Sequence, residues 1–83
     1  MAESRSVVEA LRYLAASIEL FQQFRDPLNC ARVLRNRSLI FESDRRYSDA
    51  LGNMKQAFNL LSESSYLKHT YEKEIRRLTQ KAR

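Results

Sequence analysis

The amino-acid sequence predicts an all-α fold of one domain, and three observations support this. The chain of 83 residues has one glycine and one proline, whereas good helix formers such as Ala, Leu, Arg and Glu are abundant. Apolar residues recur at helical spacing along the chain. Small and apolar residues also repeat forty residues apart, so that Ala10 and Leu14 are echoed by Ala50 and Met54. A period of this size is typical of stacked helix pairs.

The first helix is expected over residues 6–24. Ser6 with Glu9 three residues later matches a capping box, with Ser6 as the N-cap. Helical spacing then continues through a row of apolar residues: Val7, Leu11, Leu14, Ile18 and Phe21. Pro27 disfavours helix at Asp26, so the helix ends before this pair.

The second helix is expected over 28–43, with Pro27 in its first turn and Asp26 as its cap. Two apolar rows on this helix predict that it packs on two neighbours. The rows are Ala31, Leu34, Ser38 and Phe41, and Val33 with Ile40. A polar turn at 44–46 precedes a third helix over 47–61, where Asp49 lies near the positive end of the helix dipole.

The fourth helix is expected over 65–81, after the polar break Ser62-Glu63-Ser64-Ser65. Its apolar stripe is formed by Leu67, Tyr71, Ile75 and Leu78. The remainder of the helix is strongly polar. This is the pattern of a terminal helix whose outer side meets water.

The composition narrows the classes of partner. Fifteen basic and ten acidic residues give a net charge of +5, which favours an acidic partner. The N-terminus lacks an apolar run long enough for a signal peptide or a membrane span. We therefore expect a soluble cytoplasmic protein, with the nucleus as an alternative location, and no membrane partner.

The sequence contains few of the residues and motifs that catalysis or metal binding would need. A single cysteine, Cys30, cannot form an internal disulfide, and we expect it to be a small packing residue. Together with one histidine, His69, it cannot supply the four ligands of a structural zinc site. The chain has no Gly-rich phosphate loop, and His69 is expected to be exposed on a helix. The sequence thus predicts neither an enzyme nor a cofactor.

Residues 31–61 resemble a tetratricopeptide repeat, the helix-turn-helix unit that binds peptides. The first helix of that repeat is matched by Leu34, Ser38 and Phe41, and the second by Tyr47, Ala50, Met54 and Ala57. Small side chains at these helix crossings let the backbones approach closely. Residues 7–24 resemble the second helix of a preceding repeat and 65–83 the first helix of a following one. The resemblance thus implies one full repeat flanked by two half repeats.

One subtype of this family clamps the terminal carboxylate and acidic side chains of a partner peptide, as in cochaperones that hold the acidic tails of heat-shock chaperones. Its pattern has an Asn ahead of the small residue in one repeat, which Asn36 matches, and a Lys and an Arg four residues apart in the next, which Lys73 and Arg77 match. Arg32 lies four residues before Asn36, on the same helix face. The other members of the clamp would lie on a helix preceding residue 6, so the resemblance implies a partial clamp.

The resemblance implies a protein-interaction module that binds an acidic, C-terminal peptide segment in a basic concave groove. Its peptide-binding residues would be Arg32, Asn36, Lys73 and Arg77, with Leu39 as an apolar wall. A closer similarity, carried by Asn36-Arg37-Ser38 with Tyr66 and the Lys73 and Arg77 pair, is to the tetratricopeptide region of SET-and-MYND-domain methyltransferase-like proteins. Neither the SET nor the MYND module is present, so no methyltransferase activity is implied.

Two other functions remain open. The basic residues could form a phosphate-binding stripe for nucleic acid, consisting of Arg32, Arg35, Arg37, Arg76, Arg77, Lys81 and Arg83. Acidic residues interrupt this stripe, and no nucleic-acid-binding motif accompanies it. Alternatively, the open face of the first helix could pair with a second copy and form a self-associating scaffold.

Overall fold

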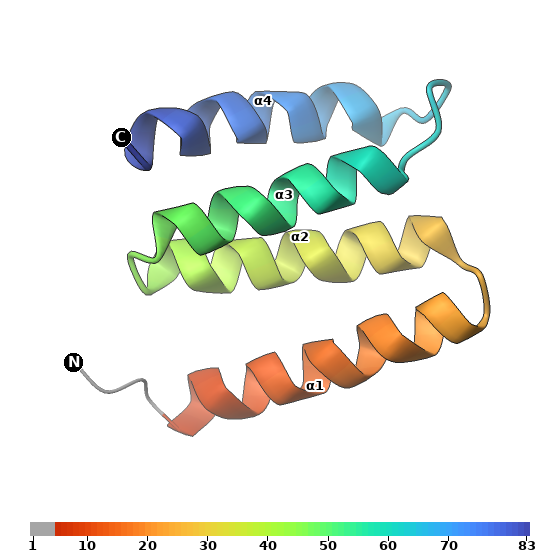
Figure 1. Cartoon of the computed structure of the whole chain (residues 1–83), viewed down its shortest axis with the longest axis horizontal. Coiled ribbons are helices and arrows are strands. Elements are labelled where there is room, and N and C mark those ends of the chain that lie inside the picture. The colour runs from red at the N-terminus through yellow and green to blue at the C-terminus, as the bar shows by residue number, and fades with distance from the viewer. Residues whose placement is uncertain (1–4) are drawn as a thin grey trace.

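The computed structural model describes residues 5–83 and contains four helices (Figure 1). The helices are α1 (Arg5–Gln23), α2 (Pro27–Ser43), α3 (Tyr47–Leu60) and α4 (Leu67–Lys81). Their limits lie within two residues of those predicted from the sequence. The described residues form helices and turns without any strand, which confirms the all-α class.

The helices pack in chain order, and successive helices run in opposite directions (Figure 1). α2 packs against both α1 and α3, and α4 packs against α3. The two apolar rows of α2 thus have the two neighbours that they predict. The Cα atoms span 40 × 31 × 14 Å, so the molecule is a flat array in which each end helix has one helical neighbour.

Small side chains hold α2 close to α3. Ser38, Ala50 and Ala57 are fully buried, and the Ser38 hydroxyl donates a hydrogen bond to the carbonyl oxygen of Ala50. Larger residues fill the remaining space: Met54 lies in the same core, and Tyr71 and Leu78 extend it to α4. Cys30 is also buried in this core, as predicted for a packing residue.

The sequence predicts the N-cap of α2 correctly but not that of α1. Asp26 caps α2 as predicted, because its carboxylate accepts a hydrogen bond from the Asn29 backbone N–H at 3.2 Å. The prediction of Ser6 as the N-cap of α1 is wrong, since the helix already includes Arg5. Glu9 pairs with Arg5 at 3.1 Å, an (i, i+4) interaction that extends the helix upstream.

Two helix ends share one turn geometry. Arg25 and Arg45 adopt left-handed backbone conformations, with φ of 53° and 58°. In each turn the next N–H bonds back into the preceding helix, to the carbonyl oxygen of Phe21 in the first turn and of Phe41 in the second. This is a Schellman-type ending, in which glycine is the usual residue. The chain therefore turns between α1 and α2, and between α2 and α3, with arginine in a strained conformation.

Candidate functional site

Long side chains link α2 to α4 across one face of the array, which we call the α2–α4 face. Arg32 on α2 donates a hydrogen bond to the Tyr66 hydroxyl at 3.0 Å. Arg35, one turn further along α2, lies 3.5 Å from the carboxylate of Glu74 on α4. These contacts place the basic side chains of α2 beside the first half of α4.

A hollow of about 440 Å³ opens on this face between the two helices. The residues lining it come from one face of each helix: Arg32, Arg35, Asn36, Leu67, Thr70 and Tyr71. Arg35 forms its inner wall, with the guanidinium carbon 5.9 Å from the centroid of the Tyr71 ring. The cation thus rests on an aromatic surface, and burial raises the pKa of the Tyr71 hydroxyl so that this residue stays neutral.

The donors around the hollow are incompletely satisfied. The Nε atom of Arg35 is buried without a hydrogen-bond partner, and its contact with Glu74 is long. Asn36 is exposed and its amide makes no hydrogen bond with any residue from 5 to 83. The described partner of Arg32 is the neutral Tyr66 hydroxyl. The hollow therefore has a net positive charge, and the exposed Arg32 guanidinium and Asn36 amide are its donors available to a ligand with carboxylate oxygens.

Further along the same face, Arg77 and Lys81 of α4 are already paired. Arg77 bonds to both carboxylate oxygens of Glu42 and also to Glu74, and Lys81 lies 2.9 Å from Glu42. Hydrogen bonds from these two cations lower the pKa of Glu42 to about 2. The carboxylates in turn raise the pKa of Arg77. We call Glu42, Glu74, Arg77 and Lys81 the ion-pair cluster.

The structure brings together two of the five residues predicted to bind peptide. Arg32 and Asn36 share the hollow, whereas Arg77 lies in the ion-pair cluster. Lys73 is exposed on α4 and pairs with no residue from 5 to 83, but it does not line the hollow. Leu39 lines a different hollow.

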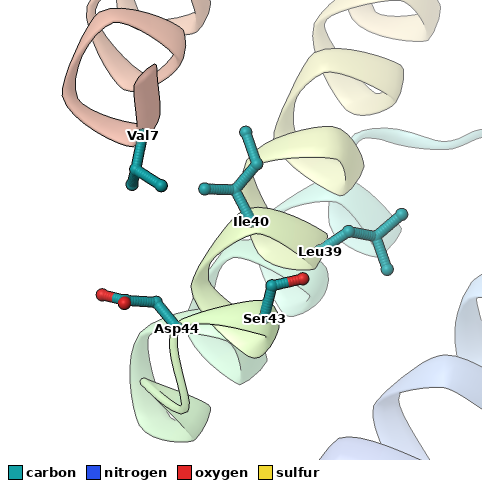
Figure 2. Close-up of a pocket in the computed structure, with 5 residues that line it drawn as sticks. All are labelled: Val7, Leu39, Ile40, Ser43 and Asp44. Carbon is teal, nitrogen blue, oxygen red and sulfur yellow. The ribbon is translucent and has the colours of Figure 1, made fainter. Parts of the chain in front are cut away.

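That second hollow, of about 280 Å³, lies where α1 approaches the end of α2. It is lined by Val7, Leu39, Ile40, Ser43 and Asp44. Figure 2 shows Ile40 beside Val7 of α1, whereas Leu39 projects away from Val7. Leu39 thus borders an apolar depression between α1 and α2.

Sequence reasoning missed the pairing of Arg77 with Glu42. These residues are 35 positions apart, and the contact depends on where α3 places α4 relative to α2. No local spacing could indicate it. The central position of Arg35 was easier to anticipate, because it follows Arg32 by three residues and so lies near the same helix face.

Residues 5–83 offer no metal site, since no three His, Cys, Asp or Glu side chains gather in a suitable group. His69 is exposed on α4, as predicted. None of the four described helices combines the length and apolar character needed to cross a membrane. Burial raises the pKa of the Cys30 thiol, which keeps the thiol protonated and unreactive.

Comparisons with protein-family models, with curated proteins and with solved structures give no match.

Proposed function

We propose that the chain is a protein-interaction module that binds an acidic peptide segment in the hollow of the α2–α4 face. The observation that carries this proposal is the grouping of Arg32, Arg35 and Asn36 around one hollow, where Arg32 is bonded to the neutral Tyr66 hydroxyl and the exposed Asn36 amide has no partner among residues 5–83. Guanidinium and amide donors suit the two oxygens of a carboxylate.

The distribution of carboxylates along the face supports this position for the ligand. Glu42 pairs with both Arg77 and Lys81, and Glu74 is shared between Arg77 and Arg35. Arg32 keeps its charge without a carboxylate among residues 5–83. An incoming carboxylate would thus meet the strongest uncompensated positive charge at the Arg32 end of the face.

The affinity expected for an acidic peptide in the hollow is that of a transient partner. Each charge-assisted hydrogen bond contributes roughly 1.5 to 3 kcal/mol, against the free energy of ordering a flexible peptide. Two or three such bonds give roughly 3 to 9 kcal/mol before that cost, so micromolar affinity, about 8 kcal/mol, is the upper limit for this contact. Tyr71 and Leu67 add an apolar floor that a peptide side chain can cover.

The residues outside the hollow take secondary roles in this proposal. Lys73 is exposed at the surface of α4. Its positive charge would attract an acidic peptide without forming a fixed contact. Arg77 would bind the peptide only by exchanging Glu42, and Leu39 would meet a peptide that continues toward the end of α2. The tetratricopeptide-like arrangement remains part of the proposal, supported by the small residues between α2 and α3.

Binding of nucleic acid ranks lower. Of the cations that would form the phosphate-binding stripe, Arg76 pairs with Glu72, while Arg77 and Lys81 pair with Glu42. Fewer charges are then left to neutralise phosphates.

An NMR titration with an acidic peptide tests the proposal, and the same peptide with an amidated C-terminus shows whether the terminal carboxylate matters. We expect shifts at Asn36 and Thr70, and an affinity about tenfold lower for Arg32→Gln, equivalent to the loss of one charge-assisted bond. Arg76→Gln is the matched control, because Arg76 lies outside the hollow. Absence of shifts at the hollow, or equal loss in both variants, would disprove the proposal.

A further inference from the structure

Helix α1 carries a row of large apolar side chains that the other residues of the range 5–83 leave uncovered. Tyr13, Leu20 and Phe24 are 74%, 48% and 72% exposed. They follow one another by seven and four residues, which places them on one side of the helix. Phe24 stays on the helical path because its N–H donates to the Leu20 carbonyl oxygen at 3.0 Å. We call these three residues the α1 stripe.

The forty-residue echo shows what covers the corresponding face elsewhere in the chain. Tyr13 and Ser17 correspond to Asn53 and Ala57 of α3. Asn53 is 9% exposed and Ala57 fully buried, because this side of α3 packs against α2. Tyr13 and Ser17 have no such helix above them, since α1 packs against α2 through other residues, among them Leu14 and Ile18. Tyr13 of the α1 stripe thus occupies a position that packs against a helix in α3, whereas Leu60, the residue that corresponds to Leu20, is itself 39% exposed.

The opposite end of the array is a poor complement for this stripe. The residues of α4 that point away from the core are hydrophilic, among them Lys73, Arg76 and Gln80. Stacking of α4 of one copy on α1 of the next would bury these groups against Tyr13 and Phe24, at a high desolvation cost. Head-to-tail filaments are therefore disfavoured. Pairing of two identical apolar stripes about a two-fold axis instead gives a closed dimer.

Charged residues beside the stripe favour a second copy as the occupant. Arg12 and Glu19 lie seven residues apart on the same flank of the stripe, and neither pairs with any residue from 5 to 83. When two identical helices meet antiparallel about a two-fold axis, the same flanks face one another. Arg12 of each copy then approaches Glu19 of the other, so two symmetric ion pairs form at the rim.

We propose that two copies of the chain associate through antiparallel packing of their α1 stripes. A single helix face buries less than the roughly 800 Å² per partner of a standard interface, so the dimer is a weak one. The α2–α4 face plays no part in this contact, and the proposal stands independently of peptide binding.

Sedimentation equilibrium of the full chain over a range of concentrations tests the dimer. The average mass should rise toward twice that of the monomer, and Leu20→Glu should hold the chain monomeric. Leu28→Glu is the matched control, because Leu28 is 40% exposed but lies on α2, outside the stripe. Circular dichroism verifies that each variant remains helical. A wild-type chain that stays monomeric to millimolar concentration overturns the proposal, as does a Leu20→Glu variant that still dimerises.

A charge exchange tests the antiparallel register. Arg12→Glu alone and Glu19→Arg alone should each weaken dimerisation several-fold, because like charges then meet across the interface. The double variant Arg12→Glu with Glu19→Arg should recover the wild-type dimer constant. Both sites are exposed, so folding should be unaffected. Failure of the double variant to recover dimerisation excludes this register and with it the proposed interface.

Discussion

The hydroxyl of Ser38 donates a hydrogen bond to the backbone carbonyl oxygen of Ala50 over 2.6 Å, and both residues are fully buried. A helical serine usually bonds to a carbonyl within its own helix. Here the bond crosses from α2 to α3, which requires the two helix backbones to lie very close together. The same contact explains why residue 50 is small and why residue 38 is small and carries a hydroxyl.

Ser38 should tolerate loss of its hydroxyl better than an increase in size. Ser38→Ala removes one hydrogen bond and should lower the free energy of unfolding by about 1 kcal/mol. Ser38→Leu adds a side chain where no space exists and should lower it by about 2 to 4 kcal/mol. Urea unfolding followed by circular dichroism measures both values. Equal effects of the two variants would contradict close packing at this crossing.

Arg45 is a site where glycine should stabilise the protein. Its left-handed backbone, with φ of 58°, is strained for any residue with a Cβ atom. Arg45→Gly should raise the free energy of unfolding by about 0.5 to 1 kcal/mol. Arg45→Val should lower it, since a β-branched residue fits this conformation worst. Thermal unfolding of the two variants checks the order, and a valine variant as stable as the glycine variant would rule this explanation out.

Local signals in the sequence are sufficient to predict the helices. Asp26 followed by Pro27 marks the start of α2, and the structure has the predicted cap there. The small residues Ser38, Ala50 and Ala57 mark where α2 meets α3, and all three are buried. Each of these features depends on residues close in sequence or on one repeated spacing, which is why the sequence reveals them.

The candidate site depends on contacts that local patterns do not encode. Arg77 and Lys73 are both basic residues on α4, yet Arg77 reaches Glu42 across the helices and Lys73 faces solvent. Their spacing alone predicts one shared face. Which of these cations meets a carboxylate is decided by how α3 places α4 relative to α2, because long side chains alone link α2 and α4.

Cys30 should react slowly with thiol reagents as long as the protein is folded. It is 2% exposed, and burial raises the pKa of its thiol, so both access and thiolate content are low. A maleimide or disulfide reagent should therefore label it at a rate that follows unfolding, and denaturant should accelerate labelling by orders of magnitude. Rapid labelling in native buffer would show that the first turn of α2 opens readily.

Glu42 should make stability depend on pH in the acid range. Its pKa is about 2 in the folded protein, against an ordinary value of 4.5. The contribution is therefore fully present above pH 4.5 and is lost as the pH falls toward 2. Because Arg77 and Lys81 are 40% and 46% exposed, solvent screening reduces the contribution to about 1 to 2 kcal/mol.

Glu42→Gln should remove this contribution, so at neutral pH it should unfold at a lower temperature than the wild type. The difference should narrow as the pH falls from 4.5 to 2, because protonation of Glu42 then removes the same charge from the wild type. Glu72→Gln is the matched control: its ion pair with Arg76 lies at the surface and should change stability by less than about 0.5 kcal/mol. A gap between Glu42→Gln and wild type that stays constant from pH 6 to about 2 would mean that Glu42 acts through its shape, and that its charge contributes nothing to the pairing of α2 with α4.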